Sequence, residues 1–315
     1  MINGIINVYK EPGFTSHDVV AKLRGILKTK KIGHTGTLDP DAEGVLPVCI
    51  GNATKLCELL TDKTKEYQAG LLLGTVTDTQ DTSGTIIGGN NSWKELSTKE
   101  IRQAVLGFTG VYSQIPPMYS ALKVNGKKLY ELAREGIEVE RKPRNVEIYN
   151  IEIVSMEIPR AELIVRCSKG TYIRTLCHDI GSRLGCGGCM ASLVRNAVGR
   201  FHITDSHTLS EIEELWNEGR FFESGILLET EKALEEYPVL KTMPHADKLV
   251  RNGNVLAWES FSDAVNMEAG VEDGQWFRIH DSSGRFLAVY EYQKRNRTFK
   301  SNKMFCCRQM GRKEE

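Results

Sequence analysis

Residues 33–44, GHTGTLDPDAEG, constrain the fold most, because this segment is unsuited to regular helix or strand. Its three glycines permit backbone angles that other residues avoid, and they let a bulky ligand approach the backbone closely. Pro40 fixes the backbone directly after Asp39. We therefore predict a rigid loop that holds the Asp39 carboxylate in place, as expected of a functional site.

The three carboxylates of this loop allow several interpretations. Asp39, Asp41 and Glu43 alternate as in the first half of a calcium-binding loop. The twelfth position of such a loop should hold a bidentate Glu, and here it is Ile50. A phosphate-binding loop would need the Gly-x-x-x-x-Gly-Lys-Ser/Thr pattern, which this segment lacks. An ordinary turn with solvated acids and a catalytic aspartate on a rigid loop both remain open on spacing alone.

The composition is that of a soluble, globular protein with room for one large and one small domain: 315 residues, of which 40% are hydrophobic and 26% charged. An apolar run of about 18 residues is missing, and the first residues lack the charged-then-apolar pattern of a signal peptide. We therefore expect a cytoplasmic protein outside the membrane. Its eight cysteines are then expected to be free thiols.

One cysteine pair has the spacing of a zinc site. Two glycines separate Cys186 from Cys189, and Cys177-His178 precedes them. A structural zinc site normally needs a second spaced pair, which the sequence lacks. A turn that ends a helix is therefore the favoured interpretation, and no metal is predicted.

The net charge is zero, with 41 basic and 41 acidic residues, although an RNA-binding protein should gain affinity from an excess of Lys and Arg. The charges are, however, segregated. Residues 294–313 hold eight basic residues and no acidic one, whereas residues 205–236 hold ten acidic and two basic residues. One face can therefore be positive. A solvated basic tail and a solvated acidic helix remain alternatives.

Hydrophobic periodicity predicts a mixture of helices and strands. The predicted helices span residues 16–28, 53–61, 101–106 and 171–184, and the predicted strands span residues 45–50, 67–73, 146–151 and 163–167. Ser16 is expected to cap the first helix, and Ser97 with Glu100 forms a capping box before the third. Tyr67 is placed at a strand start. Because helices and strands do not alternate strictly, the predicted class is α+β with a mixed or largely antiparallel sheet.

Several short motifs follow one another along the chain, and such an ordered series is highly specific for a protein family. They are residues 10–16 (KEPGFTS), 31–40 (KIGHTGTLDP), 42–47 (AEGVLP), 65–67 (KEY), 77–81 (TDTQD), 114–121 (QIPPMYSA) and 170–176 (GTYIRTL). Through them the sequence resembles the TruB family of tRNA pseudouridine synthases, which isomerise the uridine at position 55 in the T-loop of tRNA. The resemblance is strong over about residues 1–235 and loose beyond. It implies the pseudouridine synthase fold, with a central sheet and an RNA-binding cleft.

The resemblance also implies the partners and the domain organisation. The partner is the T-arm of tRNA, without an obligate protein partner, and a monomer is expected. No cofactor is required, because the isomerisation changes no redox state and adds no external group. Residues 1–236 would form the catalytic domain and residues 237–315 a PUA-like RNA-binding domain with a basic tail. In the latter, β-rich runs between Asn-Gly, Asp-Gly and Ser-Gly turns, including residues 248–254, describe a small barrel. A structural cap is the alternative.

Residues 114–145 form a basic, glycine-punctuated segment with a short helix in its middle. Basic residues near aromatic ones suit an RNA backbone and its exposed bases. The resemblance makes this segment a thumb-like insertion that clasps the T-arm, and the residues predicted to contact RNA are Lys123, Lys127, Lys128 and Arg144. A solvated surface helix remains the alternative, because four glutamates dilute the charge.

The resemblance assigns the chemistry to three residues. Asp39 is the nucleophile, and at an ordinary pKa near ~3.9 it is ionised at neutral pH. Arg174 is its ion-pair partner, and Tyr67 stacks on the target base and assists proton transfer. A phenol with a pKa near ~10 is a poor base unless its environment shifts it. Attack at C1′, attack at C6 and a glycal path stay open.

The target base lies inside a folded loop and must be extruded before chemistry. His34 is the candidate wedge that fills the gap, and a polar histidine that stabilises the turn is the alternative. The resemblance implies that Asp81, Tyr172 and Leu193 line or support the uracil pocket, and that Lys10 and Lys31 touch phosphates. An RNA-binding or RNA-folding module in which chemistry is secondary and a synthase for another RNA are the competing hypotheses.

Overall fold

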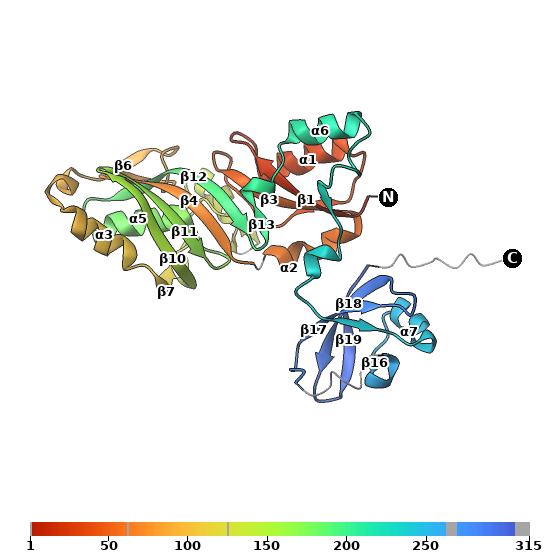
Figure 1. Ribbon diagram of the computed structural model, residues 1–315. Coiled ribbons are helices and arrows are strands. Elements are labelled where there is room, and N and C mark those ends of the chain that lie inside the picture. The colour runs from red at the N-terminus through yellow and green to blue at the C-terminus, as the bar shows by residue number, and fades with distance from the viewer. Residues whose placement is uncertain (1, 62, 125, 263–269, 306–315) are drawn as a thin grey trace. The chain divides into compact units, whose positions relative to one another are not determined.

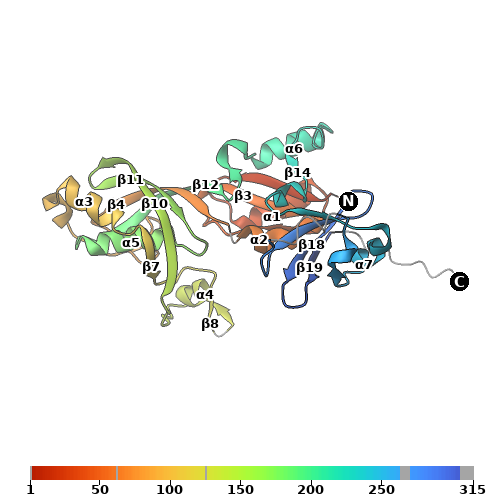
Figure 2. The same ribbon diagram turned by 60° about the horizontal axis from the view of Figure 1, so that its bottom comes forward.

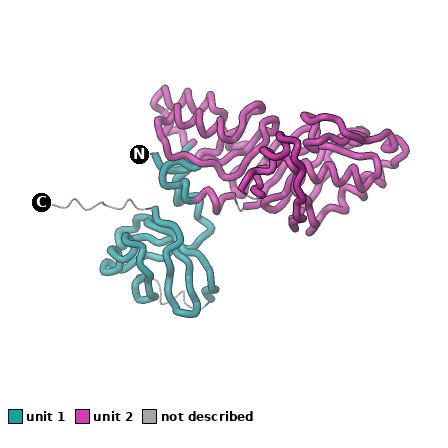
Figure 3. The backbone as a smooth tube through the Cα atoms, turned by 180° about the vertical axis from the view of Figure 1, so that it is seen from behind, with its two compact units in different colours: residues 1–5, 49–55, 227–315 teal, residues 6–48, 56–226 magenta. Residues whose placement is uncertain are grey.

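The computed structural model describes residues 2–61, 63–124, 126–262 and 270–305 (Figure 1). The chain divides into two units, which Figure 3 distinguishes by colour. One unit consists of Ile6–Val48 and Leu56–Ile226, and the other of Met1–Ile5, Cys49–Lys55 and Leu227–Glu315. The functional boundary at residue 237 stays a prediction.

A long mixed sheet lies mostly in the larger unit, and only β14 and the ends of β1 and β3 belong to the smaller one. Its strand order is β14-β1-β3-β12-β4-β11-β10-β7. The bounds are β1 Gly4–Lys10, β3 Glu43–Ile50, β4 Lys65–Leu73, β7 Gly110–Gln114, β10 Arg144–Glu157, β11 Arg160–Cys167, β12 Gly188–Val198 and β14 Leu227–Leu228, with β2 Ile32–His34 beside β3 and β13 Phe201–His202 beside β12. Strands β3 and β12 are parallel, and the neighbours from β12 to β7 are antiparallel. The predicted α+β class with a mixed sheet is confirmed.

Two helices pack on this sheet through apolar faces (Figure 1). They are α3 (Thr98–Leu106) and α5 (Ile173–Arg183). Ile101 of α3 and Leu176 of α5 are completely buried in one core cluster with Leu163 of β11. The predicted capping box before α3 is confirmed, because the Ser97 side chain accepts a hydrogen bond from the Glu100 backbone and the Glu100 carboxylate accepts one from the Ser97 backbone.

The remaining helices and short strands surround this core. Helices α1 (Ser16–Ile26) and α6 (Leu209–Asn217) lie side by side (Figure 1). Helix α2 spans Cys57–Thr61, and α4 spans Leu129–Arg134 beside the short strands β8 (Lys123–Val124) and β9 (Lys127–Lys128). Strands β5 (Val76–Thr77) and β6 (Ile86–Gly88) form a separate pair.

Three local predictions are wrong in detail. Thr15, and not Ser16, caps α1, because its hydroxyl accepts from the Asp18 backbone. The helix predicted at 53–61 begins only at Cys57, after a 3-10 turn at Gly51–Leu56. Tyr67 lies two residues inside β4, since that strand already starts at Lys65.

The smaller unit contains a five-stranded sheet in the order β15-β17-β18-β19-β16. The bounds are β15 Val239–Lys241, β16 Leu256–Ala257, β17 Trp276–His280, β18 Phe286–Gln293 and β19 Thr298–Met304. Aromatic side chains dominate its core, where the Phe299 ring lies edge-on to Trp258 and Phe277. Residues 247–251 form helix α7 (Asp247–Arg251), so the β-rich run predicted at 248–254 is wrong.

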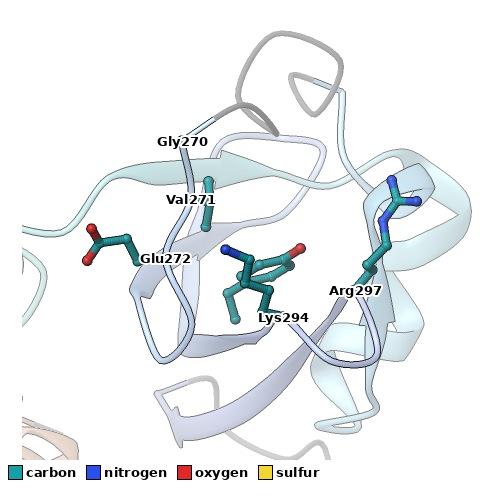
Figure 4. Close-up of a pocket in the computed structure, with 6 residues that line it drawn as sticks. Gly270, Val271, Glu272, Lys294 and Arg297 are labelled. Carbon is teal, nitrogen blue, oxygen red and sulfur yellow. The ribbon is translucent and has the colours of Figure 1, made fainter.

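A hollow of about 550 Å³ lies on the smaller unit (Figure 4). Its lining residues are Gly270, Val271, Glu272, Tyr292, Lys294 and Arg297. Lys294 and Arg297 belong to the predicted basic tail, whose residues 306–313 lie outside the described residues. No helix in the described ranges is long and apolar enough to cross a membrane.

Replacing either of two helical glycines by alanine should change the stability, and the two changes should have opposite signs. A Cβ on Gly181 of α5 would lie 2.2 Å from the backbone nitrogen of Gly188, so Gly181→Ala should force α5 away from the start of β12. We expect a loss of about 1–3 kcal/mol in the free energy of unfolding. Gly25 of α1 is exposed with nothing within 4 Å of such a Cβ. Gly25→Ala should therefore stabilise by about 0.5–1 kcal/mol. Urea unfolding of both variants checks this pair, and equal effects would contradict the packing.

Candidate active site

The loop that carries Asp39 runs between β2 and β3 and is shorter than predicted. Gly33 lies in β2 and Gly44 in β3, so only residues 35–42 are outside the strands. Gly44 has φ 101°, and a Cβ there would lie 2.4 Å from the carbonyl oxygen of Arg195. Glycine is therefore required at this end of the loop for both backbone angle and space.

Both neighbours of Asp39 are held through their backbones. Leu38 donates its N–H to the Ser16 hydroxyl at 2.9 Å. The Pro40 carbonyl accepts a hydrogen bond from the Lys10 ammonium, also at 2.9 Å. The backbone around Asp39 is consequently fixed on either side, as the rigid-loop prediction requires.

Lys10 does not fit its predicted contact with phosphates. Its side chain is completely buried, and the ammonium also donates to the carbonyls of Glu11 at 3.0 Å and Phe14 at 2.6 Å. These two bonds and the bond to Pro40 use all three N–H groups. Burial lowers the pKa of Lys10 to about 8, and the nearby Asp39 carboxylate opposes that shift. Lys10 is therefore a tether of the loop.

Arg174 forms a bidentate ion pair with Asp39, as predicted for this pair. Its Nε lies 3.0 Å from Oδ2 and its Nη2 lies 3.2 Å from Oδ1. The Arg174 side chain is only 6% exposed, whereas that of Asp39 is 38% exposed. The carboxylate can thus be reached from solvent while its partner is buried.

The remaining N–H groups of Arg174 contact two other segments. Nη1 donates to the Thr79 carbonyl at 3.1 Å and lies 3.5 Å from the Asp81 carboxylate. Nη2 also donates to the Tyr119 carbonyl at 2.8 Å. The hydroxyls of Thr79 and Ser83 donate to Asp81 at 2.7 and 2.6 Å. Asp81 is therefore a second carboxylate that contacts Arg174, and hydroxyl groups of the protein satisfy its oxygens.

The charge state of Asp39 reflects two opposing effects. Burial raises the pKa of the Asp39 carboxyl above its ordinary value, and the Arg174 guanidinium lowers it. The Asp81 carboxylate adds a smaller upward shift. Without Arg174, nothing of comparable strength would favour the ionised form.

Tyr67 and Leu193 lie in one core cluster with Leu38, the neighbour of Asp39. Burial raises the pKa of the Tyr67 phenol, while the charge of Arg195 and a hydrogen bond from it act in the opposite direction. Tyr67 is thus a neutral phenol at neutral pH. Its pKa moves away from the range that suits a general base.

His34 is the last residue of β2, and its ring lies edge-on to that of His17 with 5.4 Å between centroids. Its Nδ1 accepts a hydrogen bond from the Gly36 backbone at 3.3 Å. Burial lowers the pKa of His34, and the charges of His17 and Arg195 lower it further. The imidazole is therefore neutral at neutral pH and able to stack. Lys31, just before β2, is exposed.

Tyr172 immediately precedes α5, and Gln114 holds its backbone on both sides. The Tyr172 N–H donates to the Gln114 side chain at 2.8 Å, and the Gln114 amide donates to the Tyr172 carbonyl at 3.0 Å. This paired contact fixes the start of the helix that carries Arg174. Arg144 is exposed at the start of β10 and lies opposite Gln114 in the sheet.

The predicted RNA-contacting lysines lie on the short strands β8 and β9 next to α4, and Figure 2 shows β8 beside that helix. Lys123 and Lys127 are exposed, and Lys127 lies 3.8 Å from the Glu135 carboxylate. The Lys128 ammonium donates to the Tyr130 hydroxyl at 3.0 Å. This segment is therefore basic and exposed, with part of its charge already paired.

Sequence reasoning missed Gln114 and Arg195 as parts of the site. Gln114 was noticed only as part of a motif. Arg195 lies two residues after Leu193 on β12, both side chains are buried, and their partners Tyr67 and Ala69 are likewise two residues apart on β4. Strand alternation could have placed Arg195 beside Leu193, had a charged residue been accepted in the core.

Among the described residues, no group of three or more His, Cys, Asp or Glu side chains could hold a metal ion. Cys186 and Cys189 are buried free thiols around the start of β12. Cys167 and Cys177 are also buried free thiols.

Two family models match adjoining parts of the chain. The TruB family pseudouridylate synthase N-terminal domain matches residues 24–173, and the tRNA pseudouridylate synthase B C-terminal domain matches residues 174–235. The tRNA pseudouridine synthase B of Lachnoclostridium phytofermentans is 48% identical over 317 residues, which cover 96% of this chain and 100% of that protein. The protein of the same name from Bacillus pumilus is 46% identical, covering 92% of this chain and 93% of its own length.

Solved structures support the same relationship. A Cbf5-Nop10-Gar1 complex contains a chain with a TM-score of 0.73 and 28% identity, and the match covers 97% of this chain and 85% of that one. An H/ACA RNP bound to a substrate RNA containing 2′-deoxyuridine gives a TM-score of 0.72 at 27% identity, covering 97% and 86%. The predicted pseudouridine synthase fold with a small PUA-like unit is thereby confirmed, and the chain belongs to the TruB family of pseudouridine synthases.

Proposed function

We propose that this protein isomerises uridine to pseudouridine in the T-loop of tRNA, at position 55. The observation that carries the proposal is the Asp39 carboxylate, which is partly exposed on a fixed loop and held by the buried Arg174. Relatives at 42–48% identity are named tRNA pseudouridine synthase B. Together, the site and the family favour catalysis over RNA binding alone.

The reaction breaks the bond from N1 to C1′, rotates the uracil and joins C5 to C1′; C5 loses a proton and N1 gains one, so the product is an isomer of the substrate. It needs no cofactor. We assign the nucleophile to Asp39, which attacks C1′ or C6 or takes part in a glycal path. Each of these routes starts from an ionised carboxylate, so Arg174 serves all of them by opposing the effect of burial on the Asp39 pKa.

Tyr67 and the residues around it form the proposed base pocket. Because burial raises the pKa of Tyr67, we assign it stacking on the uracil and donation of a hydrogen bond rather than proton removal as a phenolate. Leu193 would pack against the base, and Tyr172 would line the pocket. Asp81 would act through Arg174 instead of touching the substrate.

Base extrusion costs a few kcal/mol of stacking, which contacts from the protein must offset. We assign the wedge to His34, since a neutral imidazole can stack between bases without bringing a charge into the RNA helix. Lys31 would contact a phosphate near this point.

The wider RNA surface is proposed from charge and exposure. Lys123, Lys127, Lys128 and Arg144 would contact the T-arm through the thumb-like segment at residues 114–145. The unit beyond residue 237 would add RNA contacts through Lys294 and Arg297, which line the hollow in Figure 4. The proposal also includes a monomer in the cytoplasm without an obligate protein partner.

Asp39→Asn tests the central assignment. The substitution keeps the size of the side chain but removes the nucleophilic charge, so pseudouridine formation should fall about 1,000-fold or more. Tritium release from a T-arm hairpin labelled at uridine C5 measures it, because binding alone cannot produce that release. Asp41→Asn is the matched control, since Asp41 is exposed on the same loop and loses the same charge. Comparable losses in both variants, or an active Asp39→Asn, would refute the assignment.

The buried ammonium of Lys10 predicts a pH dependence. Below its pKa of about 8 it has three N–H groups for three carbonyls, and above it has only two. The single-turnover rate should therefore fall as pH rises through about 8. Global unfolding cannot cause this fall. The folded pKa lies below the ordinary 10.5, so between these values the unfolded chain binds more protons and stability rises with pH.

The measurement is the single-turnover rate from pH 7 to 9.5, with hairpin affinity determined at each pH. Lys10→Met is the control, because it should be slower throughout and lack the inflection. An unchanged inflection in Lys10→Met would assign the titration to another group.

A further inference from the structure

Arg195 is among the largest fully buried side chains in the described part of the chain, and it is charged. It lies on β12 with 1% of its surface exposed. None of the ion pairs in the described part of the chain includes Arg195, and its hydrogen bonds go to the uncharged carbonyls of Val45 and Gly36. A buried guanidinium costs much free energy unless its N–H groups are paired, so its contacts should explain why it is there.

Those contacts join the two ends of the Asp39 loop. Nε of Arg195 donates to the Val45 carbonyl at 2.7 Å, and Nη2 donates to the Gly36 carbonyl at 3.2 Å. Gly36 lies two residues after the end of β2, and Val45 is the third residue of β3. One planar group therefore bridges the point where the loop leaves the sheet and the point where it returns.

Close packing of β12 against β3 requires the glycine at position 44. A Cβ on Gly44 would clash with the Arg195 backbone at 2.4 Å, whereas one on Gly36 would make ordinary contact with Nη1 of Arg195 at 3.8 Å. Gly44 is also the residue opposite Arg195 in the parallel pairing of β3 and β12. Gly44 thus permits the close approach of the strand that carries Arg195.

Arg195 also reaches Tyr67 on the other side of β12. The two residues are opposite each other in the antiparallel pairing of β12 and β4. Opposite residues of an antiparallel pair lie on the same face of the sheet, and the charge of Arg195 lowers the pKa of the Tyr67 phenol against the larger effect of burial. Three segments that carry proposed site residues therefore meet at one guanidinium.

We infer that Arg195 is a positioning residue, which closes the loop that presents Asp39 and orients the Tyr67 hydroxyl. The inference deepens the proposed function and rests on it for the effect on rate. The guanidinium does not touch the RNA. It acts by holding two groups in place, so its loss should reduce the rate of the chemical step more than the affinity for RNA.

Arg195→Met tests the inference, because it keeps much of the volume and removes every donor. Hydrogen exchange of the amides at residues 35–44 should become about tenfold faster or more as the loop opens. The single-turnover rate at saturating T-arm hairpin should fall about 100-fold, with the dissociation constant changed less than about threefold. Arg195→Lys should restore only part of each effect, since an ammonium lacks the fork that spans both carbonyls.

Lys65→Met is the matched control. Lys65 is another buried cation of the same sheet, and its ammonium donates to the Thr61 and Lys63 carbonyls, away from the Asp39 loop. This variant should lose stability without faster exchange at residues 35–44. If Lys65→Met slows catalysis as much as Arg195→Met does, the effect belongs to buried charge in general and the inference is wrong.

The two readouts separate the inference from the proposed function. Unchanged exchange at residues 35–44 in Arg195→Met overturns the closing role, whatever the activity. Faster exchange with an unchanged rate overturns the positioning role. Should the unaltered protein form no pseudouridine, the proposed function fails while the exchange data still decide whether Arg195 closes the loop. If Arg195→Met does not fold, Arg195→Lys provides the same comparison.

Discussion

The guanidinium of Arg174 is almost completely buried, and its N–H groups must all be paired. Its acceptors come from the loop at Asp39, from the turn at Thr79 and Asp81, and from Tyr119. These segments are far apart in the sequence. Hydrogen bonds to Arg174 therefore hold these three segments around the first turn of α5. The geometry of the site depends on all of these bonds being formed.

Buried cations offset the acidic residues of the loop. Lys10, Arg174 and Arg195 are all buried close to it, and the carboxylates of Asp39, Asp41 and Glu43 act on Lys10, while Asp81 contacts Arg174. Three cations therefore stand against four carboxylates, so the loop itself is not a positive surface. Attraction for a phosphate backbone has to come from exposed basic residues such as Lys31, Lys123 and Lys127.

Patterns that are local in sequence predicted most of the fold. The capping box at Ser97 and the strands at 45–50 and 163–167 each depend on neighbouring residues. The role of Lys10 could not be predicted in the same way, because its acceptor at Pro40 lies 30 residues away. The family resemblance suggested a contact with phosphates for Lys10, which does not fit its completely buried side chain. Arg195 was missed because its bond to Val45 spans 150 residues.

These long-range contacts have one common effect, which is to restrict the conformational freedom of Asp39, the proposed nucleophile. The backbone before Asp39 is held by Ser16, the backbone after it by Lys10, and the carboxylate itself by Arg174. The entropy of ordering the loop is therefore lost during folding and need not be lost again when RNA binds. A loop fixed in this way can present a charge to a substrate without rearranging, which is the condition for electrostatic stabilisation of a transition state. The glycines thus allow neighbouring groups to pack closely against the loop, and contacts with those groups make the loop rigid.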